Sequence, residues 1–386
     1  MFTAVLVTGA SGFVATHIVR LLLQEGYRVR GTLRDMNNEL KLQPLRDLQY
    51  SDERLELVYG ELNDAESWKK AVQNCDYVMH TASPCELVAS KTIVQDAVNG
   101  TLNVLRAAAG CPTVKKVVLT SSCGAVNEGY QKEKRIFDET DWTNVSDKKV
   151  LPYHRSKTEA ERAAWKFVKD EKGMIKKKSK LIYINIFFFL HFKLTAVNPG
   201  VIVGRLLHNY KNASAAVIGY FLDSTMPAYP QLSISIVDIE DVAEAHLRAM
   251  LYPESDGERF LLTCCTMSFK EIADLLRKEF ASEGYYVPAI KAPFVLLWLY
   301  ARLSAKARSA VDLYGHEEYF DNSKARRILK MNFRDPRKGI IDMAYDMIEK
   351  GLLPRKGRFA PSKNSPKKSL YGKKRSDKSK TDKSTK

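Results

Sequence analysis

The sequence predicts an α/β protein built on a doubly wound parallel sheet, with a smaller lobe following it in the chain. Three observations lead to this prediction. Short apolar runs alternate with longer amphipathic stretches over the first 125 residues, a glycine-rich turn follows the first apolar run, and the rhythm changes to loops and helices after about Gly204. Such alternation is typical of a parallel sheet covered by helices on both faces. Right-handed crossovers then place the ligand site at the carboxyl ends of the strands.

The elements follow from local patterns. The predicted strands are the short apolar runs Ala4–Thr8, Arg28–Leu33, Leu55–Tyr59, Tyr77–Thr81, Lys116–Thr120 and Leu194–Asn198. Between strands, apolar residues recur at helical spacing. Later in the chain, Ser268 and Glu271 form a capping box that begins a helix, and Ile340–Lys350 is a further amphipathic helix.

The segment Thr8–Ala15 connects the first predicted strand to the first predicted helix. Its glycines allow a tight turn and a close approach to a pyrophosphate, and the helix N-terminus supplies N–H donors. The alternative is an ordinary strand-to-helix turn, which its position at the first strand argues against. We therefore expect a dinucleotide to bind here. The expected contact residues are Gly9, Ser11, Gly12, Phe13 and Val14.

Arg34 stands just past the second predicted strand, 22 residues after Gly12. An acidic residue at this place holds the ribose diol of NAD, whereas an arginine suits the 2′-phosphate of NADP. Lys41 could add a second positive charge, although Asp35 stands next to the arginine. The sequence therefore favours NADP(H), with a solvated surface arginine as the alternative.

Tyr153 and Lys157 open a predicted helix at a spacing that places both side chains on one face. An ammonium group lowers the pKa of a neighbouring phenol, so a tyrosine in this setting can protonate a carbonyl oxygen. The pair alone occurs often by chance. Ser122 at the end of a predicted central strand supplies a third group that can polarise a carbonyl, with Ser121 as its rival for that role.

Composition divides the chain into parts. Residues 1–204 form the predicted Rossmann-type NADP-binding domain, and residues 205–353 form mainly the substrate lobe, with some of its strands returning to the main sheet. Residues 354–386 are rich in Lys and contain almost nothing to bury, which predicts a disordered tail. Residues 174–192 are an atypical insertion in which lysines precede a run of ten mostly apolar residues.

The net charge of +16 is confined to two appendages. Residues 355–386 carry 13 Lys and Arg against two Asp, and residues 174–192 add four lysines without an acid, so the remaining chain is nearly neutral. This distribution argues against specific nucleic-acid binding. The tail is predicted to be a solvated extension, with nuclear targeting or a weak polyanion contact as alternatives.

The cysteines and histidines predict no metal site. The six cysteines and seven histidines show no metal-type spacing and no disulfide framework, which suits a reducing compartment, and a cytoplasmic location is expected. The first apolar run ends in a glycine turn, so it is not an export signal. The ten mostly apolar residues at 181–190 are too few to span a bilayer.

Together these motifs resemble the extended short-chain dehydrogenases, in particular the dihydroflavonol reductase-like group of the NAD-dependent epimerase/dehydratase superfamily. The resemblance covers roughly residues 3–172 and 193–353. The residues and motifs that match the family are Thr8–Ala15, Arg34, His80–Pro84, Thr120–Ser122, Asn127, Tyr153, Lys157, Val197–Gly200, Val237–Ala243 and Phe320–Lys324. It implies hydride transfer from NADPH to an aldehyde or ketone. Ser122 would hold the carbonyl, Tyr153 would protonate it, and Lys157 would also bind the nicotinamide ribose.

The resemblance implies further contacts. Cofactor contacts are expected from Glu61, Leu62, Thr81, Ala82, Ser83, Pro199 and Ile202, in addition to Tyr153 and Lys157. Glu61 departs mildly from the family, which has Asp there. Asn127 matches a position that touches polyphenol substrates in plant members, so substrate contacts are expected from Ser122, Asn127 and Tyr153.

The insertion at 174–192 departs from the family pattern, in which a short turn follows the helix that carries Tyr153. Its composition is that of translated A/T-rich DNA, so it is either a retained intron in a gene model or a real surface insertion. A real insertion would threaten solubility, because an exposed β-prone segment favours aggregation. A transcript read continuously through the segment in most messages would exclude the intron.

The sequence favours an NADPH-dependent reductase of a small-molecule carbonyl compound, acting on CH–OH and C=O groups. A non-catalytic NADP-binding scaffold is the alternative from another class. Such a protein can lose its catalytic Ser, Tyr and Lys, whereas this chain keeps all three, which argues against the scaffold. An NAD-dependent epimerase or hydroxysteroid dehydrogenase of the same superfamily is the third hypothesis. Both a monomer and a homodimer are compatible with the sequence.

Overall fold

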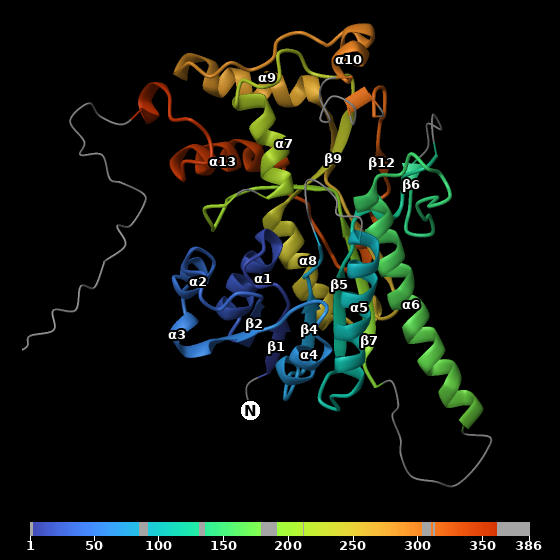
Figure 1. Ribbon diagram of the computed structural model, residues 1–386. Coiled ribbons are helices and arrows are strands. Elements are labelled where there is room, and N and C mark those ends of the chain that lie inside the picture. Colours follow the sequence, from blue (N-terminus) through green and yellow to red (C-terminus); the bar gives the residue numbers. More distant parts are fainter. Residues whose placement is uncertain are drawn as a thin grey trace, which may run out of the picture.

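The computed structural model describes residues 3–84, 92–130, 136–178, 191–210, 212–302, 310–311 and 313–360. Its centre is a sheet of seven parallel strands in the order β10-β7-β5-β4-β1-β2-β3 (Figure 1). The strands are β1 (Ala4–Val7), β2 (Arg28–Leu33), β3 (Leu55–Tyr59), β4 (Tyr77–His80), β5 (Lys116–Thr120), β7 (Lys193–Pro199) and β10 (Arg259–Leu262). The strand order reverses between β1 and β4, which defines the doubly wound topology and confirms the predicted fold class.

Two layers of helices cover the sheet. On one face α1 packs against α8, and on the other face α5 packs along α6, as Figure 1 shows. The helices of these layers are α1 (Phe13–Gln24), α2 (Glu39–Arg46), α3 (Ser51–Arg54), α4 (Ala65–Ala71), α5 (Ile93–Ala109), α6 (Pro152–Lys178) and α8 (Ile239–Leu251). Each face has its own apolar cluster, and the fully buried Trp68 anchors the one under α4, α5 and α6.

The strands form where the apolar runs predict them because both faces of a parallel sheet are buried. Predicted and observed bounds coincide for Arg28–Leu33, Leu55–Tyr59 and Lys116–Thr120. In β5 the first four residues are buried, including Lys116, whose ammonium reaches Ala249 O at 3.0 Å and Tyr252 O at 2.8 Å. This lysine can be buried because it donates to carbonyl groups in the last turn of α8 and just after it.

The C-terminal lobe lies at one end of the main sheet (Figure 1). Its three-stranded sheet has the order β11-β9-β8, with β8 parallel and β11 antiparallel to β9. Its elements are β8 (Val201–Val203), α7 (Ala213–Leu222), β9 (Ser233–Asp238), β11 (Cys265–Ser268), α9 (Phe269–Phe280), α10 (Phe294–Tyr300), α12 (Ser323–Ile328) and α13 (Pro336–Glu349). A parallel pair, β6 (Ile136–Phe137) and β12 (Tyr319–Phe320), connects the lobe to the main domain. The capping box of Ser268 and Glu271 is present at the start of α9.

The structure also shows how the two unusual segments meet the fold. Helix α6 continues through Lys178, the fifth residue of the insertion. Phe192, the last residue of the insertion, is 1 % exposed and belongs to the same apolar cluster as Leu194 of β7. Residues 179–190 lie outside the described part. After Pro354, Phe359 packs against Tyr345 at a ring distance of 5.7 Å. Residues 355–360 therefore contact the lobe, beyond the boundary expected from composition. The rest of the predicted tail lies outside the described residues.

Candidate active site

The residues expected to bind cofactor and substrate gather at the carboxyl edge of the main sheet. Each of five strands is followed by at least one of them. They are Gly9, Ser11, Gly12, Phe13 and Val14 after β1, Arg34 after β2, Glu61 and Leu62 after β3, Thr81, Ala82 and Ser83 after β4, and Ser122 and Asn127 after β5. Pro199 ends β7 and Ile202 lies in β8, while Lys41 is on α2 and Tyr153 and Lys157 are on α6.

The glycine turn has a backbone that only glycine adopts easily. Gly9 has φ +65°, and a Cβ atom there would lie 3.2 Å from two atoms of Ala82. The Gly12 amide donates to Gly9 O at 2.8 Å, and Gly12 is the N-cap of the 12-residue helix α1. The turn is therefore tight, and it leads directly into a helix N-terminus, which favours an anion.

A hydrogen-bond network fixes this turn to the end of β4. The Thr8 hydroxyl accepts from the amides of Thr81 at 3.0 Å and Ala82 at 2.9 Å, so its own proton goes to His80 Nδ1 at 2.9 Å. His80 Nε2 is buried and has no hydrogen-bond partner in the described part of the chain. Burial, together with the nearby Lys157 ammonium, lowers the pKa of His80 to about 3, so the ring is neutral.

The loop after β3 is held against α5. A Cβ atom on Gly100 would lie 2.6 Å from Leu62 Cδ2, so the leucine side chain packs directly on the helix backbone. Asn103 Nδ2 donates to Leu62 O at 2.9 Å. Leu62 is thus positioned by α5, and the Glu61 amide donates to the Ser67 hydroxyl at 3.2 Å.

Arg34 and Lys41 have different surroundings. Arg34 is exposed at the end of β2. Lys41 Nζ lies 6.0 Å from the centre of the Tyr210 ring, and Tyr210 stacks on His208 with ring centres 3.8 Å apart. His208 meets Phe13 edge to face at 6.0 Å. An aromatic ladder therefore connects Lys41 to the first turn of α1.

Changing Arg34 to glutamate tests the predicted cofactor preference. We expect the affinity for NADPH to fall about 10–100-fold, equivalent to losing one or two charge-assisted hydrogen bonds, while the affinity for NADH changes little. The measurement is nicotinamide fluorescence titration with both cofactors. Arg28→Glu, at the opposite end of the same strand, is the matched control. An equal loss of affinity for NADH and NADPH would show that Arg34 does not contact the 2′-phosphate.

The two serines after β5 have different partners. The Ser121 hydroxyl is buried and donates to Glu161 Oε2 at 2.5 Å. The Ser122 hydroxyl is partly exposed and accepts from the Gly124 amide at 3.1 Å, so its own proton can be donated to another group. Ser121 is therefore engaged in the protein interior, and Ser122 is the serine that can donate to a carbonyl oxygen.

Helix α6 presents Tyr153, Lys157 and Glu161 at successive intervals of four residues, so they share a face. Lys157 is 7 % exposed, and its Nζ lies 6.0 Å from the centre of the Tyr153 ring and 3.4 Å from Thr120 O. The Tyr153 carbonyl accepts from the Ser156 hydroxyl at 2.7 Å. The face that carries the phenol and the ammonium therefore lies against the end of β5, where Ser122 follows.

Glu161 is the centre of a buried polar network that sequence reasoning missed. Its carboxylate is fully buried and contacts Arg259 Nε at 2.5 Å, Asn198 Nδ2 at 2.8 Å and Trp165 Nε1 at 3.1 Å. Asn198 also donates to Ser122 O at 3.1 Å. The network joins α6, β7 and β10 behind the serine. The signal available in the sequence was Asn198 in the motif Val197–Gly200, which was not recognised as a bridge.

A second polar cluster lies beyond Asn127. His154 Nδ1 is 3.2 Å from Glu128 Oε1, and the ligand atoms of Glu128, His316 and Glu318 all lie within 4.8 Å of one another. Burial, together with the nearby Glu128 carboxylate, raises the pKa of Glu318 to about 7. Burial also raises the pKa of Glu128 and lowers that of His154 to about 4. These residues are far apart in the sequence, which gave no signal for their proximity.

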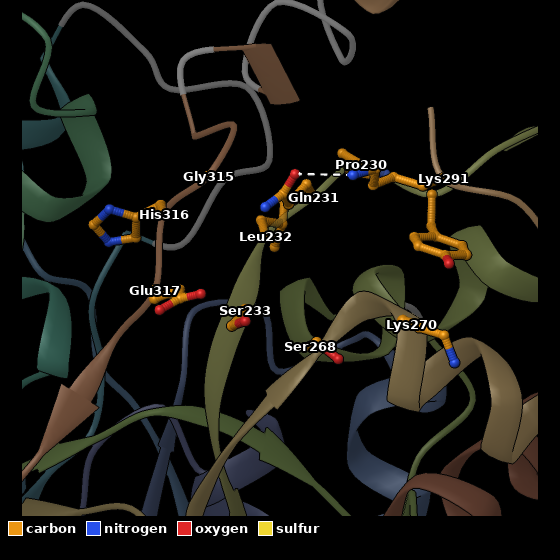
Figure 2. Close-up of a pocket in the computed structure, with 11 residues that line it drawn as sticks. Pro230, Gln231, Leu232, Ser233, Ser268, Lys270, Lys291, Gly315, His316 and Glu317 are labelled. Atoms are coloured by element: carbon orange, nitrogen blue, oxygen red, sulfur yellow. Dashed lines mark hydrogen bonds between the residues drawn. The ribbon is translucent and has the colours of Figure 1, made fainter. Parts of the chain in front are cut away.

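A cavity of about 280 Å³ lies next to this cluster in the C-terminal lobe (Figure 2). It is lined by residues of three segments, namely Tyr229–Ser233, Ser268 with Lys270, and Gly315–Glu317, together with Lys291. The amide of Gly315 donates to Gln231 O, and Lys291 Nζ donates to Gln231 Oε1 at 3.3 Å. Figure 2 shows the His316 ring and the Glu317 carboxylate on opposite sides of their segment.

The residues at the carboxyl edge fit NADP(H). The Gly9 turn leaves no side chain between the backbone and a pyrophosphate, and His80 Nε2 is a buried polar atom without a partner in the described residues. Arg34 is accessible for a phosphate, and Lys157 is close enough to the end of β5 to reach a ribose there. When bound, the cofactor would supply a hydride.

Comparison with known proteins supports this fit. Residues 5–262 match the NAD dependent epimerase/dehydratase family. The chain is 36 % identical to cinnamoyl-CoA reductase CAD2 of Medicago truncatula over 288 residues, covering 72 % of this chain and 81 % of the relative. It is 33 % identical to cinnamoyl-CoA reductase 1 of Petunia hybrida over 353 residues, covering 91 % and 93 %.

A solved structure is similar over almost the same range. The yeast methylglyoxal/isovaleraldehyde reductase Gre2 in complex with NADPH superimposes with a TM-score of 0.71 at 25 % identity, covering 90 % of this chain and 98 % of that one. The family match, the sheet order and the glycine turn agree with one another. The chain therefore belongs to the NAD-dependent epimerase/dehydratase family, as a dihydroflavonol reductase-like member of the extended short-chain dehydrogenases.

Proposed function

We propose that the protein reduces an aldehyde or ketone with NADPH and that Ser122, Tyr153 and Lys157 are its catalytic residues. The observation that carries this proposal is the face of α6, which holds Tyr153 and Lys157 against the end of β5. The family and its NADPH-bound structural relative support the cofactor. Bound NADPH supplies the hydride to the carbonyl carbon.

The chain's own residues complete the reaction at the carbonyl oxygen. Ser122 donates a hydrogen bond to that oxygen and polarises the carbonyl. Tyr153 transfers its phenolic proton to the same oxygen, which yields the alcohol and leaves a phenolate. The ammonium of Lys157, on the same helix face, stabilises the phenolate and can hold the nicotinamide ribose. Asn127, which is 2 % exposed and five residues after Ser122, is proposed to contact the substrate.

The remaining expectations are part of this proposal. The substrate is a small carbonyl compound, the protein is a monomer or homodimer, and its place is the cytoplasm. The five cysteines in the described part are free, which supports a reducing compartment. No helix among the described residues is long and apolar enough to cross a membrane.

The test is NADPH oxidation, followed by absorbance, against aldehydes, diketones, cinnamoyl thioesters, dihydroflavonols and steroids. Ser122→Ala is expected to lower kcat on the order of 10²–10³, the cost of one lost donor to the developing oxyanion. Cofactor binding should be unchanged, because the serine hydroxyl makes only a local bond to the Gly124 amide. A folded, NADPH-binding protein that reduces no compound would favour the scaffold hypothesis. Bound NAD on purification would favour an epimerase.

A further inference from the structure

The cluster of Glu128, His316 and Glu318 has the composition of a metal site. One carboxylate or imidazole atom from each residue lies within 4.8 Å of the other two. Glu128 follows the turn η1 (Cys123–Ala125) of the main domain, whereas His316 and Glu318 precede β12. The Glu128 side chain is 10 % exposed and that of Glu318 is 19 % exposed, so the cluster is an interior feature rather than a solvated acidic surface.

The charge of this cluster is not balanced by arginine or lysine. Three other buried carboxylates have a guanidinium partner: Arg259 for Glu161, Arg205 for Asp346 and Arg334 for Asp241. Within the described ranges, neither Glu128 nor Glu318 pairs with a Lys or Arg, and their ion-pair neighbours are histidines. Glu318 also accepts a hydrogen bond from the Ser235 amide, at 3.3 Å, and the Asn127 side chain lies close to its carboxylate. Two buried carboxylates facing each other without a cation are costly, and a bound cation would remove that cost.

Unpartnered polar atoms point to the same place. In the described part of the chain, the nine-tenths buried Glu128 carboxylate has His154 Nδ1 at 3.2 Å from Oε1 as its ion-pair contact and no Lys or Arg partner. His316 Nε2 is buried without a hydrogen bond and lies 3.7 Å from Glu318 Oε1. Buried polar atoms of folded proteins almost always have partners, and an ion can serve as one.

We propose that Glu128, His316 and Glu318 bind a divalent transition-metal ion of the zinc type. Zn²⁺ takes one imidazole nitrogen and carboxylate oxygens at about 2.0–2.2 Å. Two carboxylates neutralise its charge, and the three ligand atoms, which lie within 4.8 Å of one another, would move closer together around the ion. His154, with Nδ1 at 3.2 Å from Glu128 Oε1, is placed to hold that ligand in position.

The ion would connect the two parts of the molecule. One ligand belongs to the main domain and two belong to the segment that leads into β12, which itself pairs with β6. His154 also packs on Gly124, where a Cβ atom would lie 2.3 Å from its ring. The ion would therefore fasten the C-terminal segment beside the turn that follows Ser122. This inference does not depend on the proposed reaction.

Zinc binding to the full chain is the test. The protein is freed of any affinity tag, treated with a chelator, and dialysed against buffered micromolar Zn²⁺, and the bound metal is measured by mass spectrometry. One zinc ion per chain is expected, with a rise in the melting temperature of the wild type. Glu318→Gln and His316→Ala should each weaken binding at least about tenfold.

Two controls keep the result interpretable. Glu317→Gln removes a neighbouring charge from the opposite side of the segment and should bind zinc like the wild type (Figure 2). Retained NADPH binding, measured by nicotinamide fluorescence, shows that each variant is folded. The proposal is overturned if the folded wild type takes up no zinc, or if Glu318→Gln and His316→Ala bind it as tightly as the wild type does.

Discussion

Replacing Tyr153 by phenylalanine is expected to lower kcat by a factor on the order of 10²–10⁴, the usual contribution of a general acid. The change removes only the hydroxyl, so the ring keeps its edge-to-face contact with His154 at 5.6 Å. Ser156 and Thr158 continue to donate to the carbonyls of Tyr153 and His154, and the start of α6 is preserved. NADPH affinity should therefore change little. Steady-state NADPH oxidation together with fluorescence titration measures both quantities.

Tyr300→Phe is the matched control, because it deletes a phenolic hydroxyl from an exposed position on α10. Its kcat should equal that of the wild type. Full turnover in Tyr153→Phe would show that another group protonates the carbonyl oxygen. Loss of NADPH binding in that variant would instead assign Tyr153 a role in holding the cofactor.

Replacing Arg259 by methionine is expected to destabilise the fold by about 3–5 kcal/mol, because it leaves the Glu161 carboxylate buried without its counter-charge. That carboxylate has no exposed surface, and the Arg259 side chain is 9 % exposed. Arg259 also donates to the carbonyls of Glu139 and Asp141, both at 2.8 Å, and lies 3.8 Å from the centre of the Trp142 ring. Urea unfolding followed by circular dichroism measures the free energy of unfolding.

The double variant Arg259→Met, Glu161→Gln separates charge from packing. Glutamine keeps an acceptor for Ser121 and Asn198 but carries no charge, so the double variant should be more stable than Arg259→Met alone. Lys69→Met, which breaks the exposed pair with Glu66, should leave the unfolding free energy unchanged within error. If the double variant is less stable than the single one, an uncompensated charge is not the cause of the loss.

The main sheet and its glycine turn could be predicted because their signals are local. A strand buried on both faces requires a short apolar run, and a strand-to-helix turn at φ +65° requires glycine, as at Gly9. The same holds for the capping box at Ser268. The spacing of Tyr153 and Lys157 fixes their common face as soon as the segment is helical.

Other features could not be read from the sequence. Composition predicted a tail with nothing to bury after Pro354, whereas Phe359 in that tail packs against Tyr345. The composition of the segment cannot predict that one aromatic side chain, Phe359, packs on the lobe. The choice between Ser121 and Ser122 also needed the position of Glu161, because the two serines are equivalent by pattern alone.

The sequence by itself determined the family and the fold class, and it predicted the dinucleotide turn and the residue types for carbonyl reduction, because these depend on spacings within one turn or one strand. Only the tertiary structure decided which buried charges meet. Glu161 pairs with Arg259, which is 98 residues away in the sequence. Glu128 lies close to His316 and Glu318, and in the described residues neither carboxylate pairs with a Lys or Arg. Such pairs depend on how the strands and the C-terminal lobe are folded together. The physical reason is that electrostatic pairing acts through space, whereas patterning acts along the chain.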